Sequence, residues 1–151
     1  SNLARSPRGN DRTQIKAIFA GECDIAIVNH YYYGKLFNSK NSTERQWADS
    51  VDIIIPNQGK SDRGAHINIS GGGIAKHSKN RREAEQLLEF LVSEEAQRLY
   101  ASVNYEYPVI KDIQLPTVLT KWGRFKEDNV PIEKLANSYY QAQTIIDIVG
   151  W

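Results

Sequence analysis

The residues best suited to metal chemistry are three consecutive tyrosines at positions 31–33. They follow Asn29 and His30, which come directly after a short apolar run at residues 24–28. After Asp24 that run is continuously apolar, which predicts a buried strand of a parallel sheet. In open α/β sheets, ligands bind beyond the carboxyl ends of the strands. A helix that starts there directs its free N–H groups toward an anion. The tyrosines therefore stand where a binding site is expected.

A phenolate is a hard, anionic oxygen ligand. A free phenol has a pKa near 10, but a bound trivalent cation displaces the proton because the charge of the ion favours the anionic form. Two adjacent phenolates with an anion at the helix end suit ferric iron, whereas zinc and copper prefer imidazole and thiolate. Packing is the other interpretation, because aromatic rings also gather at strand ends and tyrosine keeps its hydroxyl near the surface. From the residues alone, both interpretations stay open.

The elements that would position these residues follow from the periodicity of the apolar side chains, which predicts an α/β fold. Strands are expected at residues 24–28, 51–55 and 66–70. Helices are expected at residues 11–20, 32–37, 42–50 and 132–146. Two more are expected between them, one started by a capping box of Asn80 with Glu83 and the next capped by Ser93. Asn10 or Asp11 can cap the first helix, and Gly21 can end it. Residues 103–109 are predicted to be extended and residues 110–130 loop-rich, with Tyr139 and Tyr140 in the core.

The bulk composition narrows the function classes. The chain has 151 residues, of which 40% are hydrophobic and 25% charged, and this is typical of a globular domain. A formal net charge of +1 argues against nucleic acid as a partner. A single cysteine, Cys23, allows no disulfide within the chain. The N-terminus lacks the charged-then-apolar order of a signal peptide, so we expect either a cytosolic protein or a mature or truncated piece.

Six stretches together carry a more specific pattern. They are residues 4–12 (ARSPRGNDR), 20–29 (AGECDIAIVN), 31–36 (YYYGKL), 68–73 (NISGGG), 87–97 (LLEFLVSEEAQ) and 103–109 (VNYEYPV). In this combination the chain resembles, over nearly its whole length, the ferric-iron-binding extracytoplasmic solute-binding proteins of ABC importers. The resemblance implies no catalysis, a periplasmic or extracytoplasmic location, and delivery of iron to a permease in the membrane.

The resemblance also implies a fold and a ligand set. The fold is the two-lobed type II periplasmic-binding-protein fold, about twice as long as this chain. Residues 1–151 would be its C-terminal portion, with the second lobe, the hinge crossing and the C-terminal helices, and the N-terminal lobe would be absent. By position, Tyr31 and Tyr32 bind Fe(III), and Asn29 helps hold a synergistic anion such as carbonate, or the cleft. Asn10 is a further anion candidate. Two neighbours of the pair, Tyr33 and His30, are secondary candidates for the site. Tyr33 is expected mainly to pack.

Two other functions are compatible with parts of the sequence. A lobe of the same fold could bind another solute, such as an organic cation or a phosphorylated vitamin, with aromatic rings as stacking walls. A small serine hydrolase could use Ser70 with His66 or His77, which requires a base within hydrogen-bond distance and an oxyanion hole. The sequence around Ser70 is not a G-x-S-x-G elbow. We therefore prefer to interpret residues 70–73 as a turn at a hinge.

Overall fold

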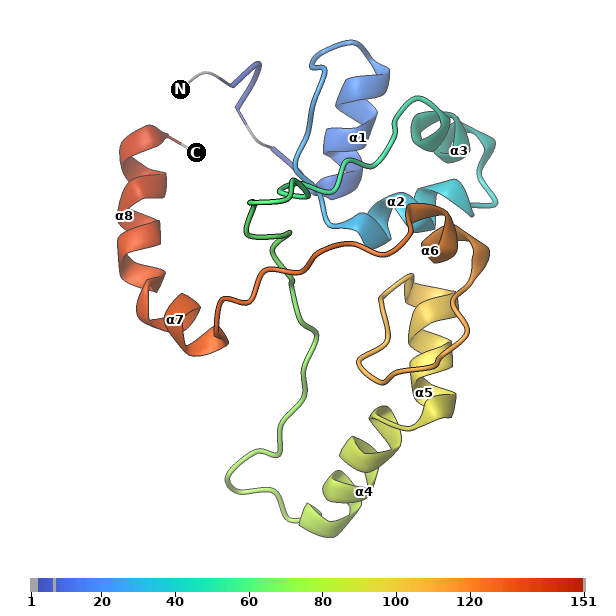
Figure 1. Ribbon diagram of the computed structural model, residues 1–151, viewed down its shortest axis with the longest axis vertical. Helices are drawn as coiled ribbons and strands as arrows, with labels where there is room; N and C mark the ends of the chain where they lie inside the picture. Colours follow the sequence, from blue (N-terminus) through green and yellow to red (C-terminus); the bar gives the residue numbers. More distant parts are fainter. Residues whose placement is uncertain (1–2, 7, 151) are drawn as a thin grey trace. The chain divides into compact units, whose positions relative to one another are not determined.

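Helices are the regular elements of the computed structural model, which describes residues 3–6 and 8–150 (Figure 1). Pro7, part of the first stretch that carries the resemblance, lies outside these residues. The described residues form two units. Unit 1 comprises those within Ser1–His66 and Phe125–Trp151, and unit 2 comprises Ile67–Arg124. Among the described helices, none is long and apolar enough to cross a membrane.

The first helix of unit 1, α1 (Asp11–Phe19), has well-defined ends. The Asn10 side chain accepts a hydrogen bond from the backbone N–H of Thr13 at 3.2 Å, and the Thr13 side chain bonds back to the Asn10 backbone. This capping box satisfies N–H groups that an α-helix otherwise leaves without partners. The chain leaves the helix at Gly21, whose φ of +73° suits glycine. Both predicted ends of this helix are confirmed.

Two short helices pack against α1. They are α2 (His30–Phe37) and α3 (Ser42–Asp49), and the three lie together in Figure 1. Their shared core contains Ile15, Leu36 and Ala48, all almost completely buried. Polar contacts tie the three helices further. The Arg12 guanidinium lies 3.3 Å from Glu44, and the same carboxylate accepts a hydrogen bond from Ser39.

The C-terminal part of unit 1 meets the first part at an isolated backbone bridge. Ala65 and Glu127 form an isolated parallel bridge, in which the Ala65 N–H donates to Lys126 O and the Asp128 N–H donates to Ala65 O, both at 2.8 Å. Gly64 allows this approach. Its φ is +99°, and a Cβ atom there would lie 2.4 Å from Glu127 O. A side chain at this position would therefore be strained and would also clash.

The end of the chain forms two helices where the sequence predicts one. These are α7 (Ile132–Asn137) and α8 (Tyr139–Val149), and the helical conformation is interrupted between them at Ser138. The Ser138 hydroxyl donates to Lys134 O at 2.9 Å, in the last turn of α7. Tyr139 and Tyr140 are 63% and 83% exposed, so their predicted place in the core is wrong for this chain.

Unit 2 contains α4 (Arg81–Leu91), α5 (Glu94–Leu99), the π-helix η1 (Tyr100–Asn104) and α6 (Thr117–Trp122). Ser93 caps α5 as predicted, accepting from the Ala96 N–H at 3.3 Å. Gln97 is a buried polar residue that joins two segments. Its amide donates to Leu91 O at 2.8 Å and its side-chain oxygen accepts from the Val109 N–H at 2.9 Å. Both the nitrogen and the oxygen of the buried Gln97 amide are therefore hydrogen-bonded.

Three local predictions in unit 2 differ from the structure. The expected extended stretch 103–109 begins within η1, which continues α5 by one wider turn. The residue after η1 is Tyr105, with φ +60°. The expected capping box at Asn80 does not form, because its side chain makes no cap hydrogen bond. Helix α6 lies in a region predicted to be loop-rich, with Val118 and Leu119 in the core.

The predicted strands do not form within residues 3–6 and 8–150, so the α/β class is not confirmed. Residues 24–28, 51–55 and 66–70 are largely without regular structure. Ile25, Ile27 and Ile54 are 80%, 81% and 81% exposed instead of buried. The physical reason is that a strand is defined by hydrogen bonds to a neighbour. Apolar composition favours such pairing but does not supply the neighbour.

Gly64 offers a test of the bridge to Glu127. We expect Gly64→Ala to lower the free energy of unfolding by more than ~2 kcal/mol, because backbone strain and a clash act together. Gly21→Ala is the matched control, since Gly21 also has a positive φ but a Cβ there meets nothing within 4 Å. It should cost only roughly 1 kcal/mol. Urea unfolding followed by circular dichroism measures both, and equal losses would contradict the close approach.

Candidate metal-binding site

The first turn of α2 brings the two predicted ligands together. Tyr31 and Tyr32 are the second and third residues of the helix and both are half-buried. Their ring centroids lie 4.6 Å apart with the planes inclined at 35°. Neighbouring residues of an α-helix do not normally face each other. The convergence of these rings therefore shows that both side chains turn toward one side of the helix start.

Tyr33 lies in a different environment. It is buried, and its ring stacks on Phe37 with a centroid distance of 6.0 Å. Burial raises the pKa of the Tyr33 phenol, and the negative charges of Asp52 and Asp49 raise it further. Each of these effects disfavours the phenolate form. The predicted packing interpretation of Tyr33 fits this environment.

Two other side chains border the pair. The ring of His30, the first residue of α2, meets the ring of Tyr31 edge-on at a centroid distance of 6.0 Å. The ammonium of Lys35 lies 5.5 Å from the centroid of the Tyr31 ring. A cation over an aromatic face is attracted by the electrons of the ring. His30 and Lys35 therefore restrict the orientations that Tyr31 can adopt.

Asn29 precedes α2 as its N-cap residue, but its side chain does not cap the helix. Its backbone N–H donates to Oδ2 of Asp11 at 2.6 Å, and its amide donates to the same oxygen at 3.0 Å. Asp11 is thus a site residue that the sequence does not predict, beyond its position at a helix start. The contact joins residues 18 positions apart and leaves no local signal in the sequence.

Asn10, the further anion candidate, is used structurally at the start of α1. Its side-chain oxygen is the acceptor of the capping box with Thr13. Asn29 is hydrogen-bonded to Asp11, which follows Asn10 in the chain. Asn10 and Asn29 are the N-cap residues of α1 and α2. Positive potential at such ends favours negative charge. That either asparagine binds an anion stays a prediction.

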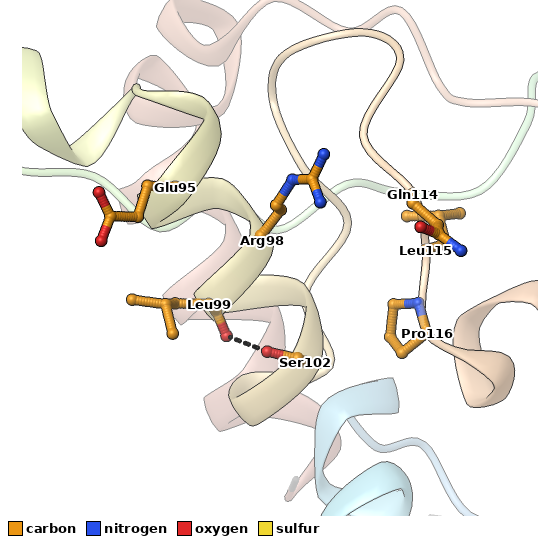
Figure 2. A pocket seen from close by; sticks show the side chains of 7 residues that line it. All are labelled: Glu95, Arg98, Leu99, Ser102, Gln114, Leu115 and Pro116. Carbon is orange, nitrogen blue, oxygen red and sulfur yellow. Dashed lines mark hydrogen bonds between the residues drawn. The ribbon is translucent and has the colours of Figure 1, made fainter.

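A separate hollow lies in unit 2 and has a volume of about 380 Å³. Figure 2 shows Glu95, Arg98, Leu99 and Ser102 on one wall and Gln114, Leu115 and Pro116 on the other. The Ser102 hydroxyl donates to Leu99 O at 3.3 Å within the first wall. None of the predicted iron ligands lines this hollow, and the described part of the chain contains no cluster of three or more histidine, cysteine, aspartate or glutamate side chains arranged for a metal.

The serine of the hydrolase alternative lies in an exposed segment without regular structure. Within the described residues, Ser70 makes no hydrogen bond to His66 or His77. A serine nucleophile depends on a base at hydrogen-bond distance. The geometry therefore gives no support to a hydrolase site at Ser70.

Comparison with known proteins gives a consistent set of similarities. Residues 13–127 match the family described as bacterial extracellular solute-binding protein. The whole chain is 41% identical to iron uptake protein A1 of Synechocystis sp. and covers 41% of the length of that protein. The chain therefore spans less than half of this relative.

Solved structures agree with the sequence comparison. A ferric binding protein from Campylobacter jejuni matches 99% of this chain with a TM-score of 0.92 and 44% identity, over 46% of its own chain. A Trichodesmium protein solved in complex with iron and citrate matches 99% of this chain with a TM-score of 0.91 and 41% identity, over 47% of its own chain. The backbone described above is thus similar to that of part of each of these proteins.

The environment of Tyr33 predicts a pH dependence of stability. In the folded protein the pKa of the Tyr33 phenol is raised above its usual value near 10. As pH rises above that value, the folded state therefore keeps a phenol proton that the unfolded state loses. The stabilising effect is complete below the unfolded pKa, and it is lost as pH rises through the folded pKa. We expect the wild-type free energy of unfolding to fall more steeply above pH ~10 than that of Tyr33→Phe. Urea unfolding at several alkaline pH values measures the difference, and parallel curves would contradict it.

Proposed function

This chain belongs to the bacterial extracellular solute-binding proteins, and we propose that its solute is ferric iron, bound by the phenolates of Tyr31 and Tyr32. The observation that carries the proposal is the convergence of these two rings at the start of α2. The relatives support the choice of solute, because their names describe iron uptake and ferric binding. The function is capture without catalysis.

The geometry of the pair favours ligation over the alternatives. If the rings served only to pack, burial like that of Tyr33 would be expected, yet Tyr31 and Tyr32 are both half-buried. A flat organic cation held between two rings needs a gap of about two ring-stacking distances. Centroids 4.6 Å apart leave no such gap. Two hydroxyls on adjacent residues, in contrast, can both reach one small ion.

The chemistry of the ion fits the same pair. Fe(III) is a hard cation, and phenolate oxygen is a hard anionic donor that iron can deprotonate. Tyr33 suits a packing role better, because it is buried, its ring stacks on Phe37, and its surroundings raise its phenol pKa. His30 lies beside Tyr31 and can supply an imidazole nitrogen as a further ligand. Two negative charges from the pair offset most of the charge of the ion.

We propose that a small anion such as carbonate fills coordination positions that the tyrosines leave. Its place is near Asn29 and Asn10, at the N-termini of α2 and α1, where the helix ends favour negative charge. The backbone N–H and the amide of Asn29 already donate to Asp11. Asn29 therefore contributes to this place mainly by fixing the start of α2.

A second part of the polypeptide is proposed to complete the site. The chain spans only 41% of the Synechocystis relative, and several of its apolar side chains are strongly exposed, including Ile27 and Ile148 at 81% and 78%. We propose that these side chains meet a second lobe, which supplies the remaining ligands. The complete protein would then work outside the cytoplasm, in the periplasm or its equivalent, and deliver iron to an ABC-type permease in the membrane.

The pair itself can be tested by removing one hydroxyl at a time. In the full-length polypeptide, Tyr31→Phe and Tyr32→Phe should each lower iron affinity by more than about 100-fold, since loss of a merely supporting residue already costs roughly 10- to 100-fold. Each should also weaken the visible phenolate–iron absorption band. Tyr33→Phe is the matched control and should change both little. If all three variants keep the affinity and the band, the assignment is wrong.

The need for a second lobe gives another test. Fe(III) on this chain alone would be coordinated partly by water, and attraction between charges is weak at an exposed site. We expect the isolated chain to lose iron to excess citrate, whereas the full-length polypeptide keeps it. Visible absorbance during a citrate titration measures the difference. Retention of iron by the isolated chain as a monomer in size-exclusion chromatography would show that residues 1–151 hold a complete site.

A further inference from the structure

We infer that Asp11 is a positioning residue for the tyrosine pair, acting through Asn29 and without binding the metal. The inference rests on the proposed function, because it assigns a role in the site formed by Tyr31 and Tyr32. It adds a residue that lies 20 positions before Tyr31 and that no feature of the tyrosine segment indicates.

The first step is the bond itself. One carboxylate oxygen of Asp11 accepts both the backbone N–H and the side-chain amide of Asn29, at 2.6 and 3.0 Å. A carboxylate is a stronger acceptor than a neutral group, and two donors on one residue fix its orientation as well as its position. Asn29 is half-buried, so these bonds are partly shielded from water. Asn29 is therefore held in both its main chain and its side chain.

The second step is the position of Asn29 in the chain. It is the N-cap of α2, with an extended conformation of φ −74° and ψ 131°, and α2 begins at the next residue. The torsion angles of the N-cap set the direction in which the first turn leaves. Tyr31 and Tyr32 follow within three residues, so a rotation at Asn29 moves both rings. A metal site needs its ligands within about 0.5 Å of their places.

The third step is that Asp11 is itself held in place. It is the first residue of α1, which is capped independently by Asn10 and Thr13. Its neighbour Arg12 lies 3.3 Å from Glu44, and Glu44 accepts from Ser39, just beyond the C-terminal end of α2. Two consecutive residues of α1 thus hold the two ends of α2, one directly and one through α3. A firmly held residue can orient the helix start, whereas a mobile one could not.

The test uses three variants of the full-length polypeptide, loaded with ferric iron alone as the probe. Asp11→Ala removes the acceptor, and Asp11→Asn keeps a side-chain oxygen but removes the charge. Asp62→Ala is the matched control, because the Asp62 carboxylate also accepts a backbone N–H, from Gly59 at 2.9 Å in unit 1, and its partner lies outside α2. Iron affinity by citrate competition, the phenolate–iron band and the melting temperature are measured for each variant.

We expect Asp11→Ala to lose roughly 10- to 100-fold in iron affinity, with a shifted or weakened band. Asp11→Asn should lose no more than about fivefold, since a neutral hydrogen bond replaces a charged one. Asp62→Ala should leave the band unchanged. If Asp11→Ala does not fold, Asn29→Asp takes its place. That change sets two carboxylates face to face, and adding Asp11→Asn should restore the band by recreating a complementary pair.

Three outcomes would overturn the inference. The first is an iron affinity and a phenolate–iron band in Asp11→Ala that equal those of the wild type. The second is an equal loss of iron affinity in Asp11→Asn and Asp11→Ala, which would indicate direct ligation or a pure charge effect. The third is an equal change in Asp62→Ala, which would indicate a general loss of stability. In each of these cases, loss of the band in Tyr31→Phe would leave the proposed function standing. A wild-type protein that shows no band would instead overturn the proposed function and the inference with it.

Discussion

A helix of eight residues is too short to be stable by itself in water, because the cost of starting a helix is spread over few hydrogen bonds. Helix α2 has this length, and it carries the tyrosine pair. Its existence therefore depends on contacts with α1 and α3, through the buried Leu36 on one face and the polar contacts at its two ends. The packing that makes the helix stable also decides which way its first turn faces. The contacts of α2 with α1 and α3 therefore determine both the stability of this helix and the geometry of the candidate site.

In the described part of the chain, the extended apolar segments lack the neighbours that stabilise α2. Residues 24–28 and 51–55 have the composition of buried strands, yet Ile25 and Ile54 are among the most exposed side chains. A helix satisfies its backbone groups internally, so α1, α2 and α3 need only side-chain packing and polar contacts from their neighbours. A strand satisfies them only through another segment, and none is available to these stretches within the described residues. The chain therefore keeps its helices, and Ile25, Ile27 and Ile54 of these stretches are exposed to solvent.

Local chemistry explains what could be predicted from the sequence. The cap at Asn10, the end at Gly21 and the cap at Ser93 each depend on residues within one helical turn, and all three are present. The place of the tyrosine pair at the start of a helix follows from equally local order, although its role in iron binding was implied by resemblance. The Asp11–Asn29 bond depends instead on the packing of two helices and has no local signature. The break at Ser138 and the widened turn of η1 are likewise tertiary outcomes.

The bridge between Ala65 and Glu127 has a consequence for how the chain can vary. The points at which the chain leaves and re-enters unit 1 are neighbours in space, because this bridge joins them. A segment whose ends meet can change in length with little cost, since the entropy of closing a loop grows only slowly with its size. Unit 2 is in this respect an insertion into unit 1, in a place where insertions are tolerated. Its size and surface can diverge between related proteins, or be redesigned, while the helices that hold the tyrosines stay as they are.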